Sequence, residues 1–348
     1  MSEILNKLRY RRDSITIEDL VFLLSTNKFD EKLFEIADEI REKYVGNEVH
    51  IRAIIEFSNI CRMDCLYCGL RNENKNLKRY RMTPQEILER AKLIAEKGIK
   101  TVVLQSGEDP YYNTEIIKNL IIEIKKLNLA VTLSIGERDF EEYKIWKEAG
   151  ADRYLMRHET ADPILYKNLH PSDTFENRKN HLIKLKELGY EIGAGCMVGL
   201  PGQGPLELAK DLIFLREIDS DMIGIGPFIP NPDTPLNREK GGDLTTTLKM
   251  IALSRILIPT ANIPATTAMG SIHPFGRQMA LKCGANVIMP NLTPNPYRPN
   301  YTLYPNKICL FEADTACIDC VRGMIKSLNR EVGKTHGFRI KTLLTYEA

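Results

Sequence analysis

Short apolar runs alternate with longer amphipathic segments along most of this chain. The apolar runs are rich in Val, Ile and Leu and end at Gly, Pro or polar residues, which is typical of buried parallel strands. We therefore expect strands at eight places, which are residues 49–58, 101–107, 130–136, 153–159, 191–199, 222–228, 263–269 and 285–290.

The segments between these runs have the period of amphipathic helices, with apolar residues three and four positions apart. The first of them also has residues that begin and end helices. Thr83 is a candidate N-cap with Glu86 three residues later, Pro84 stands at the first helical position, and Gly98 follows the last turn. Helices are predicted most clearly at residues 83–98, 114–128 and 174–189.

Eight strands alternating with helices over roughly 240 residues predict a (β/α)8 barrel, a fold that typically takes about 250 residues. The alternative is a doubly wound open sheet, which usually has fewer strands; no GxGxxG motif follows the first strand here. The barrel would span residues 49–300. We expect an N-terminal helical extension at 1–48, with Thr16 as a helix cap, and a C-terminal cysteine-containing extension at 301–348.

Charge and composition narrow the classes of function. The 348-residue chain has 48 basic and 46 acidic side chains, a formal net charge of +2. A balance this even gives no field that would attract nucleic acid or an anionic membrane. The sequence has no apolar signal segment at its start and no apolar stretch that would span a bilayer. We expect a cytoplasmic protein whose eight cysteines are thiolate ligands or reduced core residues.

Three cysteines follow the first predicted strand in the segment CRMDCLYC, residues 61–68. A loop at this place lies at the C-terminal mouth of a barrel, where active sites collect. A structural zinc site normally has four protein ligands, but the nearest histidines are His50, at the far end of the strand, and His158. Cys61, Cys65 and Cys68 better suit a four-iron, four-sulfide cluster, because three thiolates leave one iron open. Zinc with a distant fourth ligand is the alternative.

The spacing CxxxCxxC, with the aromatic Tyr67 just before the third cysteine, resembles the signature of the radical S-adenosylmethionine (SAM) enzymes. The resemblance implies that Tyr67 belongs to the cofactor site and that the methionine amino and carboxylate groups of SAM bind the open iron of a [4Fe–4S] cluster. It also implies that an electron from the reduced cluster cleaves the S–C5′ bond and releases a 5′-deoxyadenosyl radical.

Four further residues acquire cofactor-binding roles from this resemblance. Glu108, in the SGED turn (106–109), would hold the methionine ammonium, and Ser134 would bind the methionine carboxylate. Glu159, in the RHET segment (157–160), suits the ribose hydroxyls, and Arg178 can pair with a carboxylate. The plainer alternatives are turn or helix caps for Glu108 and Ser134, and a solvent-exposed helix position for Arg178.

Blocks over almost the whole chain resemble a narrower family, the FeFe-hydrogenase maturases called HydE, in the subfamily of biotin synthase and methylornithine synthase. Each block alone is weak, and their order and number carry the resemblance. They include HIRAIIEFSN, CRMDCLYCGLR, VLQSGEDPYY, RHET, MVGLPGQ, GIGPFIPNPDTP, IPATTAMG and NVIMPN.

This resemblance implies a role in assembling the organometallic H-cluster of FeFe-hydrogenase. The implied substrate is a small iron complex that bears carbon monoxide, cyanide and cysteine and is made by the partner maturase HydG. The adenosyl radical would attack the cysteine-derived sulfur, leaving an iron–sulfur fragment for the scaffold maturase HydF. An electron donor such as ferredoxin or flavodoxin is implied as well.

Side chains expected inside the barrel are compatible with an anionic substrate. Arg157 offers a fixed cationic fork, Met289 a soft apolar wall, and Tyr304 would close the cavity from above. Neutral hydrogen-bond donors stand at the ends of the second and seventh strands; these are Gln105, Ser106, Thr266 and Thr267. In the plainer alternative, the TTAM segment only fills the barrel and Met289 is a core residue.

The other five cysteines fall into two groups. Cys196, on the fifth strand, and Cys283, beside Gly284 at a helix end, are expected to be buried hydrophobic residues. Cys309, Cys317 and Cys320 resemble an accessory-cluster motif found in some HydE members, which implies a second iron–sulfur cluster. Adventitious zinc and uncoordinated thiols are the alternatives for this triplet.

Two other functions compete with a maturase. One is a methylornithine-synthase-like mutase, which would use the same cluster on an amino acid; the RHET block and the C-terminal cysteines favour the maturase. The other is a non-catalytic iron–sulfur electron carrier or scaffold. A three-cysteine site inside a barrel argues against a carrier, since electron transfer benefits from a fully ligated cluster.

Overall fold

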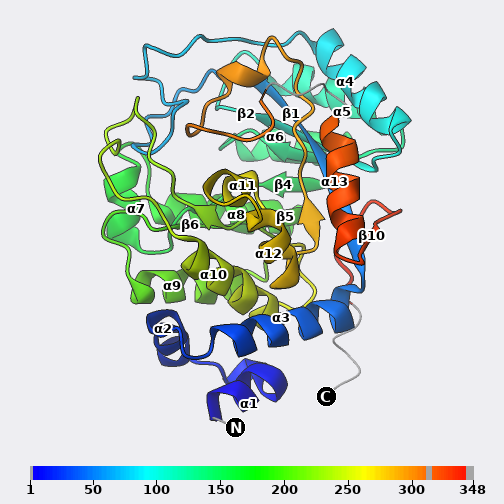
Figure 1. Cartoon of the computed structure of the whole chain (residues 1–348). Helices are drawn as coiled ribbons and strands as arrows, with labels where there is room; N and C mark the ends of the chain where they lie inside the picture. Colours follow the sequence, from blue (N-terminus) through cyan, green and yellow to red (C-terminus); the bar gives the residue numbers. More distant parts are fainter. Residues whose placement is uncertain (1–2, 311–315, 342–348) are drawn as a thin grey trace.

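The computed structural model describes residues 3–310 and 316–341 and shows a ring of parallel strands surrounded by helices (Figure 1). Three helices precede the ring: α1 (Glu3–Tyr10), α2 (Ile17–Ser25) and α3 (Asp30–Val45), with the short 3₁₀ turn η1 (Arg12–Ser14). Thr16 caps α2 as predicted, because its hydroxyl accepts from the Asp19 amide while the Asp19 carboxylate accepts from the Thr16 amide. Helices α2 and α3 cover the base of the ring, where α2 packs on α9 and α3 on α10, and α1 packs on the outside of α3.

Parallel pairing in chain order builds the ring. The strands pair as β1-β2-β3-β4-β5-β7, and β9 pairs with β1. Bridges from Met222 to Asn262 and from Pro264 to Val287 fill the remaining place between β7 and β9. Eight strand positions therefore follow one another as predicted for a (β/α)8 barrel. The strands are β1 (Glu48–Ser58), β2 (Thr101–Ser106), β3 (Ala130–Ser134), β4 (Arg153–Leu155), β5 (Glu191–Ala194), β7 (Met222–Ile223) and β9 (Val287–Ile288).

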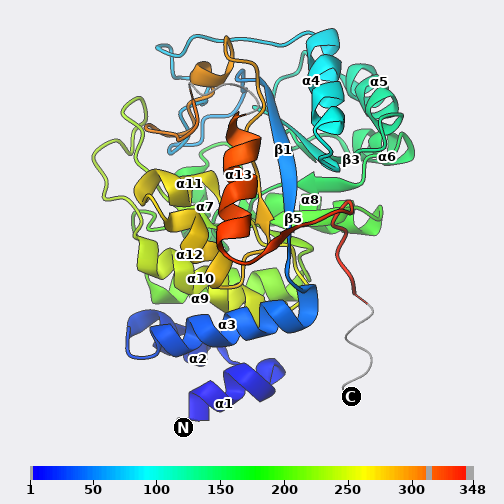
Figure 2. The same cartoon turned by 45° about the vertical axis from the view of Figure 1, so that its right-hand side comes forward.

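Helices after each strand cover the ring with one apolar face. In α5, Ile117, Leu120, Ile121 and Ile124 are buried at helical spacing. The last helix, α13, lies beside β1 in both views and contributes Val321 and Ile325 to the core (Figures 1 and 2). The helices are α4 (Pro84–Glu96), α5 (Thr114–Lys125), α6 (Phe140–Glu148), α7 (Pro163–Leu169), α8 (Phe175–Glu187), α9 (Pro205–Glu217), α10 (Leu244–Leu257), α11 (Thr267–Ile272), α12 (Gly276–Lys282) and α13 (Ala316–Ser327).

Local sequence chemistry explains where helices begin. Thr83 and Glu86 exchange bonds with each other's backbone amides, as the predicted capping box requires, and Gly98 after α4 has φ +72°. None of the helices in residues 3–310 and 316–341 is both long and apolar enough to cross a bilayer.

The predicted strand at 263–269 is wrong beyond its first residues. Only Pro264 makes a strand-like bridge there, and α11 begins at Thr267 with Thr266 as its N-cap. Apolar content cannot distinguish a buried strand from a short buried helix. The run at 191–199 also divides, into β5 and β6 (Met197–Val198), and the run at 222–228 divides into β7 and β8 (Gly226–Pro227). β6 pairs with β8 in a separate small sheet, and Gly195, with φ +154°, marks the first division.

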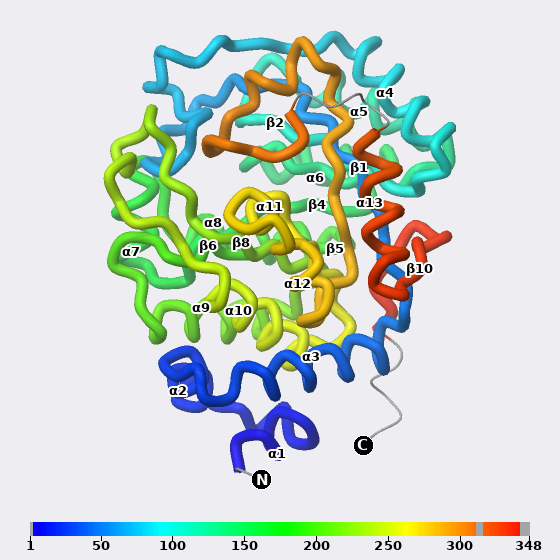
Figure 3. The backbone as a smooth tube through the Cα atoms, viewed as in Figure 1, coloured from blue at the N-terminus to red at the C-terminus, as the bar shows by residue number. Residues whose placement is uncertain are grey.

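A loop of residues 298–310, called here the closing loop, lies across the C-terminal mouth of the ring. It begins with the 3₁₀ turn η2 (Arg298–Asn300). Its Asn300 carbonyl accepts from the Asn59 side chain at 2.7 Å, and its Leu303 carbonyl accepts from the Gly69 amide at 3.1 Å. Figure 3 shows the loop (orange) beside the segment that follows β1. Lys307 reaches into the ring and pairs with Glu56 of β1, and both side chains are buried. The rest of the chain runs to β10 (Glu331–Val332), which pairs with the start of β1.

Replacing Lys307 with Met should lower the free energy of unfolding by about 3 kcal/mol, because the Glu56 carboxylate is then buried without its counter-charge. The double variant Glu56→Gln/Lys307→Met should recover part of this loss, since neither buried charge remains. Anaerobic urea unfolding followed by circular dichroism measures both values. A single variant as stable as the wild-type chain would contradict the prediction.

Candidate active site

The three cysteines of residues 61–68 lie in the loop after β1, at the mouth of the ring, and all are partly buried. The Glu108 amide donates to Cys61 Sγ at 3.4 Å. The Arg79 guanidinium holds the loop by donating to four of its carbonyls, those of Asn59, Leu70, Arg71 and Asn74, at 2.6–3.1 Å. Sequence reasoning missed Arg79, which lies beyond the motif in an ordinary basic run.

The spacing of the three sulfurs favours an iron–sulfur cluster over one zinc ion. Two sulfurs on one zinc ion, with bonds of about 2.3 Å, lie no more than about 4.6 Å apart. Among the residues that the structure describes, the set of three ligating side chains within 4.8 Å of one another is His158, Cys196 and Asp211, not the cysteine loop. The three cysteine sulfurs are therefore not gathered as closely as one zinc ion requires, and a four-iron cluster holds its thiolates farther apart than a single ion does.

Burial controls the protonation of these thiols. Desolvation raises the pKa of Cys61, and it raises the pKa of Cys68 to about 12, with the neighbouring Cys61 adding to the effect. Desolvation also raises the pKa of Cys65, with the neighbouring Cys68 adding to the effect and the Arg178 charge opposing it. Iron would displace these protons, because metal binding deprotonates a coordinating thiol. The backbone amides aimed at the sulfurs would then stabilise the thiolates.

Tyr67 is held by a histidine that sequence reasoning missed. Its hydroxyl lies 2.9 Å from His170 Nε2, and His170 Nδ1 lies 3.0 Å from the Tyr166 carbonyl, to which it donates. Nε2 is therefore the acceptor, and Tyr67 donates to it. Burial lowers the pKa of His170 to about 4, with Arg178 as a further cause, so this imidazole is neutral near pH 7. The bond thus fixes the Tyr67 ring beside the cysteine loop.

Glu108 lies in a buried turn between β2 and β3. Its Oε1 accepts from the Glu137 amide at 2.9 Å, and its Oε2 accepts from Arg62 Nε at 3.1 Å. Gly136 has φ +76°, and a Cβ at that position would lie 2.0 Å from Glu108 Cγ. The Ser106 hydroxyl donates to the Gly107 carbonyl at 2.6 Å and so turns back on its own loop. The glycine gives the Glu108 carboxylate room at the mouth.

Arg178 is buried, so the alternative of a solvent-exposed helix position is wrong. Its Nε donates to Glu137 Oε1 at 2.6 Å, and its Nη1 donates to the Arg157 carbonyl at 2.9 Å. Glu137, which sequence reasoning missed, follows β3 in SIGERD, and burial raises its pKa. Ser134 ends β3, partly buried, in register with Gln105. The arginine thus joins the ends of β3 and β4.

Arg157 and Glu159 form an ion pair after β4, with 3.0 Å between Nη2 and Oε2. Arg157 Nη2 also donates to the Cys196 carbonyl at 2.7 Å. Glu159 has φ +64°, an uncommon conformation for a residue with a side chain. Arg157 Nε and Glu159 Oε2 are buried but lack a well-aligned hydrogen-bond partner. Buried polar atoms with unused capacity are suited to bind a ligand.

The remaining predicted residues surround the top of the ring. Gln105 Nε2 lies 3.4 Å from the Tyr301 hydroxyl, and the Thr266 hydroxyl donates to the Ile225 carbonyl at 3.3 Å. Thr267 is the first residue of α11, and Met289 follows β9, partly buried. Tyr304 is hydrogen-bonded to Ser271, and its pKa is raised by burial and by the charge of Glu56, while Arg157 opposes the shift. Tyr304 is therefore close to charges on β1 and after β4.

Comparisons with known proteins identify the family. A match to the Radical SAM superfamily covers residues 55–215. The chain is 64% identical over 345 residues to the [FeFe] hydrogenase maturase subunit HydE of Thermotoga maritima, covering 99% of both chains. It belongs to the HydE family.

More distant relatives share the architecture of this HydE-family chain. It is 33% identical over 276 residues to 3-methylornithine synthase of Methanosarcina acetivorans, covering 78% of both chains. The crystal structure of methylornithine synthase (PylB) superposes with a TM-score of 0.82 at 27% identity, covering 95% of this chain and 97% of the other.

Membership in HydE makes the chain a radical SAM enzyme and excludes the electron-carrier alternative. It also implies a [4Fe–4S] cluster and SAM as cofactors. Cys61, Cys65 and Cys68 lie where they would hold that cluster, and the residues around Glu108 and Glu159 face the same mouth.

The C-terminal cysteines of this HydE-family chain lie on two sides of residues 311–315, which are outside the described part. Cys309 has φ +64° in the closing loop, and on α13 Cys317 is buried while Cys320 is exposed. The second cluster stays a prediction. Cys283 and Cys196 are buried as predicted, but Cys196 is more than a hydrophobic residue, since its thiol lies beside His158 and Asp211.

Gly136→Ala should weaken SAM binding about tenfold or more, because the new methyl group displaces the Glu108 carboxylate from its ligand position and a hydrogen bond to a charged group is worth about 1.5–3 kcal/mol. Gly98→Ala is the matched control. It has nearly the same backbone strain, with φ +72° against +76°, but its Cβ would meet no atom within 4 Å. Calorimetric titration of the reconstituted proteins with SAM measures both. Equal affinities in the two variants would remove Glu108 from the cofactor site.

Proposed function

We propose that the chain uses a SAM-derived radical to convert an iron substrate that bears carbon monoxide, cyanide and cysteine, during assembly of the H-cluster of FeFe-hydrogenase. The observation that carries this proposal is the Arg157–Glu159 pair, which lies at the same mouth as the cysteine loop and keeps unused polar capacity. With cluster and SAM bound, the chemistry supplied is reductive cleavage of SAM to a 5′-deoxyadenosyl radical that attacks the substrate's cysteine sulfur.

The cofactor half of the site is assigned to residues at the ends of β1, β2 and β3. Glu108 would accept from the methionine ammonium in place of Arg62, whose side chain is more than half exposed and can move away. Ser134 would donate to the methionine carboxylate, and Tyr67 would pack against the cofactor. Arg178 would act through Glu137 and the Arg157 carbonyl, which it already holds. Its position supports a positioning role rather than direct contact.

The substrate half is assigned to the ring interior. Arg157 would bind anionic ligands of the iron, because its planar guanidinium keeps its charge when partly buried. Glu159 would turn to the ribose hydroxyls, which requires its pairing with Arg157 to loosen. Gln105, Thr266 and Thr267 would donate or accept hydrogen bonds, Met289 would contact apolar ligands, and Tyr304 would cover the substrate. Ser106 has the weakest support, because its hydroxyl donates to its own loop.

The proposed reaction requires one protein that supplies the substrate and another that receives the product. We infer that HydG delivers the iron substrate, that HydF receives the iron–sulfur product, and that a ferredoxin or flavodoxin in the cytoplasm reduces the cluster. The family membership supports this setting.

A methylornithine-synthase-like mutase is the second candidate, supported by the close superposition on PylB. Both functions would begin with the same radical and would differ in the substrate that binds inside the ring. Production of a rearranged amino acid by the reconstituted protein would favour the mutase. The 64% identity to HydE favours the maturase.

The reduced, cluster-loaded protein should form 5′-deoxyadenosine from SAM, which mass spectrometry detects. Arg157→Ala should keep its cluster and cleave SAM, but turnover of the iron complex should fall below detection because its anionic ligands lose their cationic partner. Arg157→Lys, which keeps the charge without the fork, should be intermediate.

Two results would contradict this proposal in different ways. Absence of 5′-deoxyadenosine, with and without substrate, would reject radical chemistry. Normal turnover of the iron complex by Arg157→Ala would reject only the substrate assignment.

The accessory cluster is tested separately. A variant with Cys309, Cys317 and Cys320 all changed to Ala should contain less iron after anaerobic isolation, by the amount of one cluster, because three thiolate ligands are lost. Cys283→Ala is the control, since it removes a buried cysteine outside the triplet. Unchanged iron content in the triple variant would rule out the second cluster.

A further inference from the structure

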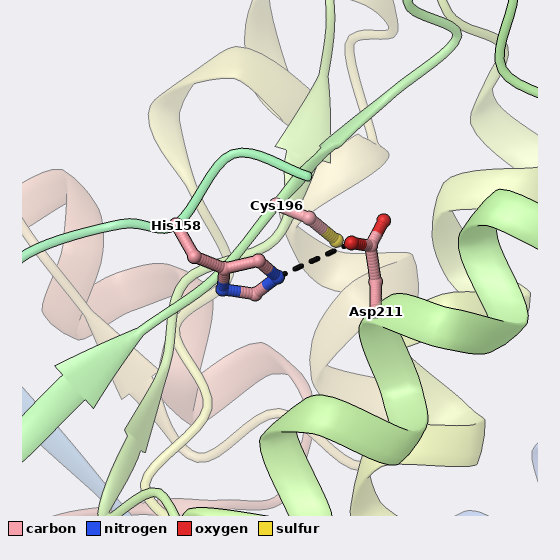
Figure 4. Close-up of side chains that lie close together, drawn as sticks. All are labelled: His158, Cys196 and Asp211. Atoms are coloured by element: carbon pink, nitrogen blue, oxygen red, sulfur yellow. Dashed lines mark hydrogen bonds and ion pairs between the residues drawn. The ribbon is translucent and has the colours of Figure 1, made fainter. Parts of the chain in front are cut away.

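Behind the Arg157–Glu159 pair, three buried side chains from separate segments converge (Figure 4). His158 lies in the turn after β4, Cys196 between β5 and β6, and Asp211 on α9. All three are fully buried. We call this group the β4 anchor. Neither the cofactor nor the substrate assignment uses it.

The hydrogen bonds of the imidazole define its protonation. The Gly195 amide donates to His158 Nδ1 at 3.2 Å. Nδ1 is therefore an acceptor, and the ring proton is on Nε2. Nε2 lies 3.3 Å from Asp211 Oδ1 and donates to it (Figure 4). The ring also packs edge-on against Phe214 of α9, at 4.9 Å between centroids. These contacts hold His158 in one orientation and one neutral tautomer.

Asp211 meets polar groups from three segments of the chain. Besides the imidazole, its carboxylate accepts from the Ala161 amide at 2.5 Å, and the Cys196 thiol lies beside it. The Gln203 side-chain amide lies 3.5 Å from its other oxygen, and Gln203 also accepts from the Gly199 amide at 2.7 Å. One carboxylate thus ties the turn after β4 to the segment between β5 and α9. It joins two motifs of the sequence, RHET and GCMVGLPGQ.

The two functional residues flank His158 and bond to the segment that the anchor holds. The Glu159 amide donates to the Gly195 carbonyl at 2.9 Å, and the Met197 amide donates to the Glu159 carbonyl at 3.1 Å. Arg157 donates to the Cys196 carbonyl. The left-handed φ of Glu159 is unfavourable for a residue with a side chain, and such a conformation persists only where the surroundings enforce it.

We propose that the β4 anchor is a positioning device for the site: His158, Asp211 and Cys196 hold the turn so that Arg157 and Glu159 project toward SAM and substrate. This inference rests on the proposed function of those two residues. The anchor side chains lie between the turn after β4 and α9, while the electrostatic interactions of Arg157 with Tyr304 and of Glu159 with Cys68 place those two side chains at the mouth. The three side chains therefore act through Arg157 and Glu159 and touch neither reactant.

A metal ion is the competing occupant, because the three ligand atoms lie within 4.8 Å of one another. Binding would require the imidazole Nε2 to lose the proton that it donates to Asp211 and the thiol to lose its own proton. Burial raises the pKa of Cys196 well above its usual range, with the nearby Asp211 charge as the second cause, so the thiol is protonated when no metal is bound. The internal hydrogen bonds therefore favour an anchor without metal.

The experiment compares two buried aspartates at opposite ends of the ring. Asp211→Asn changes the anchor at the mouth. Asp221→Asn is the control: Asp221 is also fully buried and accepts from a backbone amide, that of Ile192 at 3.0 Å, but it precedes β7 at the base, where it pairs with Arg339 at 3.2 Å. Cys196→Ser places a hydroxyl group beside Asp211 and should be close to the wild-type protein.

Asp211→Asn should weaken SAM binding and lower the rate of 5′-deoxyadenosine formation by about tenfold or more, with cluster iron content unchanged. Asp221→Asn should reduce stability without this effect. The change that SAM causes in the electron paramagnetic resonance spectrum of the reduced cluster should diminish in Asp211→Asn alone. These readouts need no iron substrate, so they remain interpretable if the maturase assignment fails.

Two outcomes would overturn the inference. In the first, Asp211→Asn and Asp221→Asn would have equal SAM affinity and equal rates at matched stability, which would make the group purely structural. In the second, the wild-type protein before cluster reconstitution would hold one equivalent of metal that Asp211→Asn and Cys196→Ala lose.

Discussion

Pairing of β9 with β1 is the constraint on which the rest of the structure depends. It closes a ring in which every strand runs parallel to its neighbours, so all carboxyl ends meet at one mouth. Without that closure, the loop after β1 and the segment after β4 would lie at distant places on an open sheet. The candidate site residues, from Cys61 in the loop after β1 to Tyr304 in the closing loop, come together at this mouth. Each lies after the end of a strand or in the loop that crosses the mouth. β1 is also the longest strand and pairs with β10, which secures the base.

Buried charges at this mouth occur in pairs that hold loops in place. Glu56 with Lys307 fixes the closing loop, and Glu137 with Arg178 joins the turns after β3 and β4. Each pair offsets the cost of removing two charges from water only when the geometry is good and other bonds satisfy the remaining atoms. In the Arg157–Glu159 pair, one atom of each side chain lacks an aligned partner. This unused capacity is compatible with the ligand-binding role proposed for the pair.

Sequence reasoning recovered what depends on local signals. Strand period and capping residues such as Thr16 and Thr83 are encoded within a few residues, and they correctly predicted the ring, these helix starts and the place of the three cysteines in the loop after β1. It missed Glu137, His170 and Lys307, because their roles arise from contacts between distant segments. Lys307 meets Glu56 across 251 positions, which no local pattern indicates.

The strand predicted at 263–269 failed for a different physical reason. Small β-branched residues such as Thr266 and Thr267 suit a strand, but they also suit the first turn of a helix, where a threonine can cap. The ring needs only the bridge at Pro264 from this segment, and the chain can then turn into α11. Local propensity left two structures open, and the position of the neighbouring strands decided between them.

Contacts between the turn after β4 and helix α9 fix the orientation of side chains at the mouth. His158 enters the layer between the strands and α9, while Arg157 and Glu159, on either side of it, pair with each other. The left-handed φ of Glu159 persists only where the surroundings hold the turn. Asp211 holds it, because it lies on α9 and bonds to both His158 and the Ala161 amide. The helix of one βα unit therefore fixes the turn that carries Arg157 and Glu159 in an earlier unit, and the ring closure keeps those two units adjacent.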